Sequence, residues 1–250
     1  MVRIKVKSSN IHSIGHENKI LEIKFNNNTI YRFLNVPEII FILFLKSKSK
    51  GTFFHEFIKN RSKGFAYTPI IASGKNANIL HYIENDQQCN AGDLLLLDVA
   101  AEYANYSSDM TRTIPVSGRF SPRQKEIYQA VLRVKNEASK LLKPNLLFKD
   151  YNTAIGELMT CELIQLGLLD KHDLRNQTPE KPAYKKYYMH STSHFLGLDT
   201  HDYGDNTQPM QAGMVLTVEP GIYIPEEGIG IRLEDNVVIQ ENGFPINLMK

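Results

Sequence analysis

The sequence predicts an α+β protein built from two modules, and three observations support this. First, the charge changes sign along the chain: residues 1–63 hold 12 Lys and Arg against 4 Asp and Glu, whereas the remainder holds 17 against 23. Second, short apolar strands recur between residues 78 and 239. Third, two amphipathic helices lie between those strands. We therefore expect a small basic α+β module over residues 1–62, followed over residues 63–250 by one curved, mostly antiparallel sheet covered by helices.

Length and composition exclude several protein classes. The chain has 250 residues, 42% hydrophobic and 22% charged, as in ordinary globular proteins. The longest apolar run, Ile39–Leu45, is too short to cross a bilayer, and the alternation over Val2–Lys7 is typical of a half-exposed strand rather than a secretory leader. Cys89 and Cys161 have no paired spacing, which indicates two free, buried thiols. We therefore expect a cytoplasmic protein without a membrane segment.

The first module combines a hairpin with a short helical region. Ile20–Phe25 and Thr29–Phe33 flank three asparagines, and asparagine tolerates the left-handed backbone that a tight turn needs. A helix beginning at Pro37 is apolar nearly all round at first, so we expect other parts of the protein to bury it. A short amphipathic segment, Phe53–Lys59, follows a basic stretch.

This module resembles the small KTSC domain. The resemblance is carried by Val6–Ile11, Tyr31–Pro37 and Ser49–Phe54. The basic charge of residues 1–62 is compatible with contact to RNA, but a solvated basic face is the preferred interpretation, because charge alone carries no recognition chemistry.

The second module alternates strands with helices. One helix has three start signals: Ser121 as N-cap, a proline at the first position, and Gln124 as the second member of a capping box. It ends at Lys143-Pro144, and a second helix ends at Gly167. Strands are expected at Asn78–Ile83, Leu94–Asp98, Met214–Glu219 and Gly230–Ile239.

Acidic residues end or interrupt these apolar strands. Asp98 follows four leucines, and a buried carboxylate needs a partner, for which a divalent cation is the most effective. Asp109 lies eleven residues later, and a hairpin would bring both carboxylates to the same end of adjacent strands. Glu219 ends a second apolar strand. Glu234 lies in a third, on the same face as Arg232.

His194 completes this set within the segment His190–Asp202. Taken singly, each of these acids is more often a turn or cap residue, and a lone histidine is more often a core residue. Their joint arrangement favours ligation. One imidazole with four carboxylates suits two divalent ions roughly 3.5–4 Å apart. Oxygen-rich ligation favours manganese, although cobalt, iron or zinc could occupy such a site.

Residues 65–248 resemble the catalytic domain of the Xaa-Pro aminopeptidases (aminopeptidase P) and the related prolidases, which have the pita-bread fold. Five motifs in the family's order carry the resemblance: Ile71–Gly74 with Asn76–Tyr82, Asp98 through Asp109–Thr113, His190–Asp202, Val218–Tyr223 and Gly230–Asp235. The resemblance implies a metal-dependent aminopeptidase that hydrolyses the N-terminal bond of peptides with proline in the second position, by means of a metal-bridging hydroxide.

Carried over position by position, the resemblance implies a role for each site residue. The residues expected to bind two divalent ions, most readily Mn²⁺, are Asp98, Asp109, His194, Glu219 and Glu234. Asp109 and Glu234 would bridge the ions, and Glu219 would also act as general base. His81 and His201 would hydrogen-bond the substrate and the tetrahedral intermediate. His190, Tyr223 and Arg232 would surround the proline and the path of the proton.

The sequence departs from the family pattern at both ends. Helices that normally precede the segment at Tyr67–Ile71 are replaced by the KTSC-like module, and the chain ends early, so we expect a shortened catalytic domain. A sheet face without helical cover would expose an apolar patch, which favours homo-oligomer formation or poor folding. Three alternatives stay open: a prolidase-like dipeptidase, a non-catalytic binding module of this fold, and a truncated or composite product. Methionine aminopeptidase fits the histidine segment and Arg232 less well.

Overall fold

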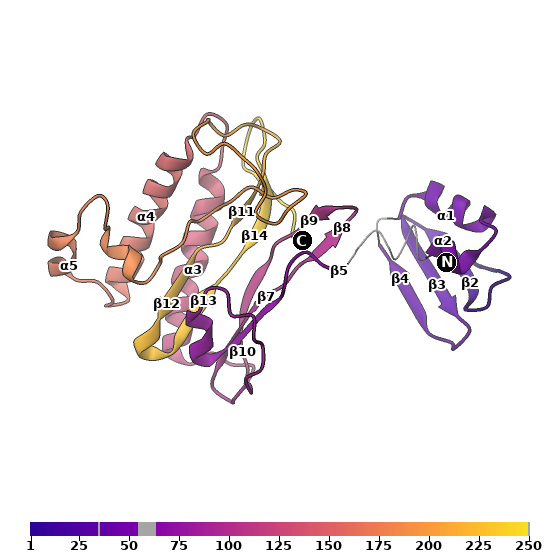
Figure 1. The fold of residues 1–250 in the computed structure, drawn as a ribbon, viewed down its shortest axis with the longest axis horizontal. Coiled ribbons are helices and arrows are strands. Elements are labelled where there is room, and N and C mark those ends of the chain that lie inside the picture. Colours follow the sequence, from indigo (N-terminus) through magenta and orange to yellow (C-terminus); the bar gives the residue numbers. More distant parts are fainter. Residues whose placement is uncertain (35, 55–63, 250) are drawn as a thin grey trace. The chain divides into compact units, whose positions relative to one another are not determined.

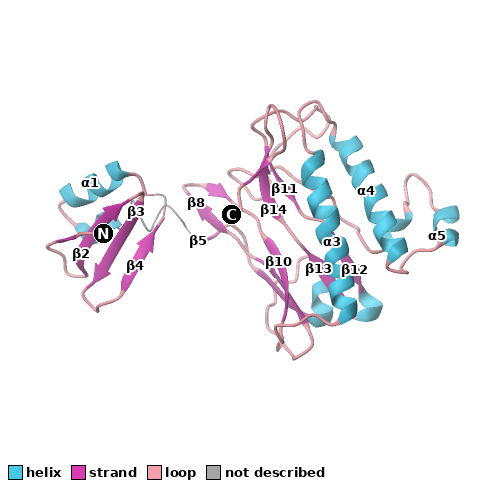
Figure 2. Cartoon of the chain, turned by 180° about the vertical axis from the view of Figure 1, so that it is seen from behind, coloured by secondary structure: helices cyan, strands magenta, loops and turns pink. Residues whose placement is uncertain are grey.

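The computed structural model describes residues 1–34, 36–54 and 64–249, and the chain divides into two compact units (Figures 1 and 2). One unit comprises residues 1–63 with Tyr103–Asn105, and the other comprises residues 64–102 with 106–250. Both units contain strands and helices, which confirms the predicted α+β class.

Among its described residues, the N-terminal unit has a four-stranded antiparallel sheet in the order β1-β2-β3-β4 and the helices α1 and α2. Its elements are β1 (Arg3–Lys5), β2 (Ile11–Glu17), β3 (Ile20–Phe25), β4 (Ile30–Phe33), α1 (Glu38–Lys46) and α2 (Lys50–Phe53). The asparagine turn forms as expected, with Asn28 at φ +67°. Phe44 of α1 is fully buried in the core of this unit, whereas Ile39 and Leu43 are exposed, so within the unit α1 packs through one side. Most of the segment predicted at Phe53–Lys59 lies outside the described residues.

The larger unit contains antiparallel ladders of two or three strands, in the orders β10-β7-β6, β11-β14-β15, β12-β13 and β5-β8-β9. Its elements are β5 (Gly64–Phe65), β6 (Ile70–Ser73), η2 (Gly74–Asn78), β7 (Leu94–Asp98), β8 (Ala101–Tyr103), β9 (Tyr106–Ser107), β10 (Thr111–Pro115), α3 (Pro122–Leu141), α4 (Phe148–Gln165), α5 (Lys171–Asn176), η3 (Ala183–Lys186), β11 (Val215–Val218), β12 (Gly221–Ile224), η4 (Pro225–Glu227), β13 (Ile229–Arg232), β14 (Asp235–Val238) and β15 (Ile246–Asn247).

Helices α3 and α4 cover the strands of the C-terminal half (Figure 2). The capping box predicted at Ser121 and Gln124 is present, and it fixes the start of α3. Fully buried apolar side chains of both helices and of β11–β14 form one core, including Ile127, Val131, Ile155, Leu216, Ile222, Ile231 and Val237. At about 25 cal/mol per Å² of apolar surface, this burial is the main force that keeps the site-bearing strands in place.

The β6–β7–β10 ladder has one face that is less well buried. Along β7 the side chains alternate, with Leu94, Leu96 and Asp98 buried and the leucines between them half-buried. Beside them Ile71 is 39% exposed and Ile114 is 46% exposed. An apolar face of this kind agrees with the expectation of incomplete cover.

The structure differs from three further expectations. Cys89 and Cys161 are free, as expected, but both are exposed and not buried. Residues 78–83 do not form the expected strand. The 3₁₀ helix η2 begins at Gly74, which has φ +57°, and a turn follows its last residue, Asn78. The Asn78 side chain donates to the carbonyl of Lys75 and so stabilises the end of this helix. The strand expected over 230–239 is two strands, β13 and β14, separated at Leu233 and Glu234.

In the described part of the chain, every helix is too short or too polar to cross a membrane.

Gly230→Ala should destabilise the larger unit. A Cβ at Gly230 would lie 2.2 Å from the backbone oxygen of Ala77, so β13 and η2 can approach this closely only with glycine there. Overpacking against backbone costs about 1–3 kcal/mol. Urea unfolding followed by circular dichroism would measure the loss, and an unchanged midpoint would contradict the prediction.

Candidate dinuclear metal centre

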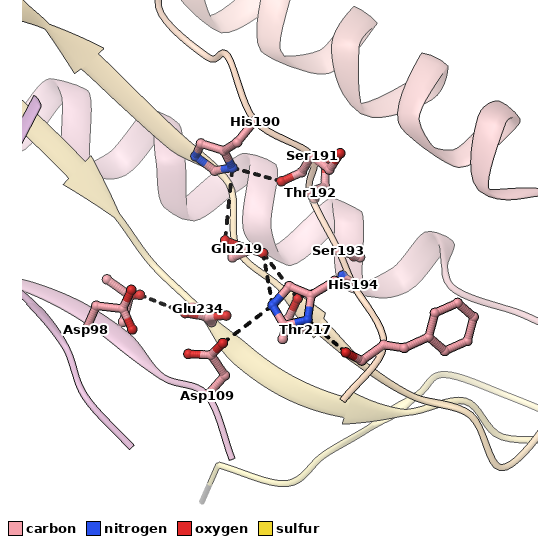
Figure 3. Close-up of polar contacts among 12 residues, drawn as sticks. Asp98, Asp109, His190, Ser191, Thr192, Ser193, His194, Thr217, Glu219 and Glu234 are labelled. Atoms are coloured by element: carbon pink, nitrogen blue, oxygen red, sulfur yellow. Dashed lines mark hydrogen bonds and ion pairs between the residues drawn. The ribbon is translucent and has the colours of Figure 1, made fainter. Parts of the chain in front are cut away.

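Four carboxylates and one histidine, drawn from separate strands and loops, meet at one place in the larger unit (Figure 3). Asp98 ends β7 opposite Thr111 of β10, and Asp109 lies two residues before Thr111, so the hairpin brings both acids together as predicted. Ligand atoms of Asp98, Asp109 and Glu234 lie within 4.8 Å of one another. Those of His194, Glu219 and Glu234 form a second such group. Glu234 is common to both groups.

His194 is held with one ring nitrogen toward the carboxylates. Its Nδ1–H donates to the carbonyl of Phe195 at 2.9 Å, which leaves Nε2 facing Asp109 Oδ2 and Glu219 Oε1, each at 3.4 Å. Its backbone N–H donates to Thr217 Oγ1 at 3.1 Å, so β11 positions the loop. A hydrogen bond that fixes the far nitrogen is what orients a metal-ligating histidine.

Glu234 is fixed by β10. Its backbone N–H donates to the carbonyl of Thr111 at 3.0 Å, and the Thr111 hydroxyl donates to Glu234 Oε2 at 2.7 Å. On the other side of the group, the buried Arg232 donates from Nη2 to Asp98 Oδ2 at 2.6 Å. Charge-assisted bonds of this kind are strong and directional, so they set the carboxylate positions before any ligand binds.

The electrostatics of the group show that it lacks positive charge. Burial raises the pKa of Glu219 to about 7, and burial together with the neighbouring carboxylates raises the pKa of Glu234 well above its ordinary value. Burial also raises the pKa of Asp98, although Arg232 opposes this. Glu234 Oε1 is buried and has no hydrogen-bond partner among the described residues. A buried, acceptor-rich group with an unpartnered oxygen fits divalent cations.

A hydrogen-bonded chain leads away from the carboxylates. Arg232 Nη1 donates to the Tyr223 hydroxyl at 2.9 Å, and that hydroxyl lies 2.8 Å from His190 Nε2. His190 Nδ1 lies 2.8 Å from the carbonyl of Ser191, so Nδ1 carries a proton and Nε2 accepts one from Tyr223. Burial lowers the pKa of His190 to about 4, which keeps the ring neutral. His190 Nδ1 is 4.0 Å from Glu219 Oε2.

A cavity of about 360 Å³ opens beside the carboxylates. Its lining includes His81 and His201 together with Asp98 and Asp109. His81 reaches it from the turn after η2 rather than from the expected strand, but the structure still places it at the site. The His201 ring lies 4.3 Å from that of His194, and burial lowers its pKa.

Sequence reasoning missed Tyr67. Its hydroxyl lies within hydrogen-bond distance of Asp98 Oδ1 and of Asp109 Oδ1, the latter at 2.7 Å. Burial and these two charges raise the pKa of Tyr67, so the hydroxyl stays protonated and remains a donor. Its contacts are 31 and 42 residues away, and no local pattern around Tyr67 indicates them.

A buried group of carboxylates and histidines at the ends of antiparallel strands is the arrangement of a metal-dependent hydrolase. The chain belongs to metallopeptidase family M24, whose model matches residues 47–241. A model of the KTSC domain matches residues 7–61.

Relatives and solved structures agree with this assignment. The chain is 44% identical to the Xaa-Pro aminopeptidase of Haemophilus influenzae over 204 residues, 77% of this chain and 47% of that protein. It is 40% identical to that of Escherichia coli over 206 residues, 78% and 46%. The putative aminopeptidase P from Bacillus anthracis matches with a TM-score of 0.69 and 40% identity over 80% of this chain and 45% of that one. Zn-substituted E. coli aminopeptidase P in complex with product gives 0.69 and 38%, over 80% and 47%.

These matches confirm the pita-bread fold. The chain spans about half the length of the curated relatives it matches.

The metal-free protein should lose stability as the pH rises from about 4.5 to about 7. The folded-state pKa of Glu219 is about 7, against 4.5 for an unperturbed glutamate. The folded state therefore holds this proton more tightly, and its advantage disappears once the proton has dissociated. The loss is complete above pH 7 and amounts to about 3 kcal/mol.

Thermal unfolding of chelator-treated protein between pH 4.5 and 8 would measure this decline. The Glu219→Gln variant, which cannot ionise at this position, should show a smaller decline and serves as the control. A wild-type profile that is flat over this window, or that rises, would refute the prediction.

Proposed function

We propose that this chain is a dinuclear metal-dependent aminopeptidase that hydrolyses the N-terminal bond of Xaa-Pro peptides. The observation that carries the proposal is the pair of overlapping ligand groups that share Glu234. Two groups with one common carboxylate suit two adjacent ions better than one. The similarity to Xaa-Pro aminopeptidases over more than three quarters of this chain supports the substrate class.

The residues proposed to hold the ions are Asp98, Asp109, His194, Glu219 and Glu234. Mn²⁺ suits a set that is rich in oxygen donors, although a zinc-substituted relative is among the similar structures. When bound, the ions would polarise the scissile carbonyl and lower the pKa of a shared water so that hydroxide is available near neutral pH.

Glu219 is proposed to transfer a proton, and the remaining residues are proposed to bind and orient the substrate. Glu219, which lies among the proposed ligands, accepts the proton of the attacking water and passes it to the leaving proline nitrogen. His81 and His201 line the cavity and donate hydrogen bonds to the carbonyl oxygen as negative charge develops on it. The neutral His190, linked through Tyr223 to Arg232, forms the wall that receives the proline ring.

The two units are proposed to have separate tasks. We place the boundary between residues 62 and 63, and we assign all metal binding and catalysis to residues 63–250. Residues 1–62 have a net positive charge, with 11 Lys and Arg against 4 Asp and Glu, and, in this proposal, bind no metal. We place the enzyme in the cytoplasm, because both cysteines are free thiols.

Purified protein loaded with MnCl₂ should bind two equivalents of manganese and release the first residue of a tripeptide with proline in second position. Metal content by mass spectrometry and product release by chromatography would test this. A matched tripeptide with alanine in place of proline is the control. Cleavage of Xaa-Pro dipeptides but not of the tripeptide would favour the prolidase alternative. Two bound ions without cleavage of either substrate would favour a non-catalytic binding module.

His81→Ala and Asp109→Ala should separate catalysis from metal binding. His81→Ala should keep both ions and lower kcat by about 10²–10³, the usual loss for an oxyanion-stabilising donor. Asp109→Ala should lose metal together with activity, because it contacts His194 and lies in the same ligand group as Asp98 and Glu234. Metal analysis and steady-state kinetics on each variant would decide. Unchanged kcat in the His81 variant would remove that residue from the catalytic set, and metal loss there would make it a ligand.

A further inference from the structure

Asp235, which follows Glu234 in the chain, lies at the centre of a polar network behind the metal centre. Its side chain is 7% exposed, and its carboxylate accepts from three donors. Arg112 Nη2 bonds Oδ1 at 2.6 Å, whereas Lys135 Nζ and Asn247 Nδ2 both bond Oδ2, the latter at 2.8 Å. Asp235 bonds Lys135 of α3, whereas the carboxylate of Glu234 lies among the proposed ligands. Lys135 lies on α3, and no metal-ligating role is proposed for it.

The network reaches Glu234 through Arg112. The second guanidinium nitrogen, Arg112 Nη1, donates to the backbone carbonyl of Glu234 and to that of Thr111, the latter at 2.9 Å. Thr111 in turn bonds both the backbone N–H and Oε2 of Glu234. Glu234 is therefore fixed at three atoms by β10, and Arg112, which makes one of those contacts, is itself held by Asp235.

Lys135 gives Asp235 a second cation, and this has two consequences. Each carboxylate oxygen of Asp235 has its own charged partner, so Arg112 need not rotate to serve both. The network also carries one negative and two positive charges, which leaves a net positive charge directly behind four clustered carboxylates. Lys135 is 15% exposed as a side chain, so water screens its charge poorly.

We propose that Lys135 is a positioning residue for the metal centre: by holding Asp235 together with Arg112, it fixes the junction of β10 and β14 that carries Glu234. This inference rests on the proposed dinuclear site. Part of the metal affinity is thereby assigned to Lys135, a residue of helix α3 that is not itself a proposed ligand.

Chain-specific controls are available on the same helix. Lys140 also lies on α3 and lines the same small polar cavity of about 250 Å³ as Lys135 and Asp235. Its ion pair is with Glu137 at the surface, where both side chains are about half exposed. Lys140→Met therefore makes the same chemical change as Lys135→Met without touching Asp235. Lys135→Arg keeps the charge and the donor.

The experiment measures Mn²⁺ affinity of the full chain by competition with a chelator, together with thermal unfolding. Lys135→Met should weaken Mn²⁺ binding by about 3–10-fold, which is less than the 10–100-fold typical of groups bonded directly to a ligand side chain. Lys135→Arg should restore most of the affinity, and Lys140→Met should match wild type. Saturating Mn²⁺ should return kcat of Lys135→Met to the wild-type value.

Equal Mn²⁺ affinity in Lys135→Met and wild type would overturn the inference, even if the variant unfolds at a lower temperature, since that pattern belongs to a purely structural lysine. An equal loss in Lys140→Met would overturn it as well. If Lys135→Met does not fold, Lys135→Gln, which keeps a neutral donor, takes its place under the same criteria. Wild-type protein that binds no Mn²⁺ would instead refute the proposed function.

Discussion

The architecture of the larger unit depends on one constraint: four carboxylates must stay close together inside a protein. Two unit charges 4 Å apart repel by about 4 kcal/mol at an effective dielectric constant of 20, and the group contains several such pairs. Left to themselves, these side chains would separate or take up protons. Around them the structure places Arg232 against Asp98, the Tyr67 hydroxyl between Asp98 and Asp109, and the Thr111 hydroxyl against Glu234. These donors hold the geometry, and the remaining negative charge is what attracts cations.

Two of these carboxylates, those of Asp98 and Glu219, are placed at the ends of buried strands. A strand that packs into the core can carry a polar side chain at its end without disturbing that core. Asp98 stands in this position after Leu94–Leu97, and Glu219 stands in it after β11. The core between these strands and helices α3 and α4 holds the proposed ligands in position, because any shift of β11 or β14 would move one of them. Stability and site geometry are coupled for this reason. Gly230 illustrates the coupling, since the close approach of β13 to η2 also fixes where the turn bearing His81 begins.

Much of this could be predicted from the sequence, and what could not has a physical reason. An acid that ends an apolar run is visible locally, so Asp98 and Glu219 could be proposed from the sequence, and their convergence with the other acids was expected from the hairpin and the family resemblance. The strand predicted at Asn78–Ile83 was wrong, because apolar content alone does not distinguish a strand from a turn that is stabilised by side-chain hydrogen bonds. Tyr67 and Lys135 could not be assigned, because their partners are distant in sequence; Lys135 and Asp235 are separated by 100 positions.

The proposed site is assembled within one unit from residues that are far apart in the sequence. All five proposed ligands, and the donors that fix them, come from one unit between residues 67 and 234. The proposed metal site therefore takes all of its ligands from this unit. The cavity of about 360 Å³ is lined by Asp98 and Asp109 together with His81 and His201, so proposed ligands and proposed substrate donors border the same space. The buried charge of the site is the reason to expect affinity for divalent cations, because burial raises the pKa of Glu219 and of Glu234 and leaves Glu234 Oε1 without a hydrogen-bond partner among the described residues.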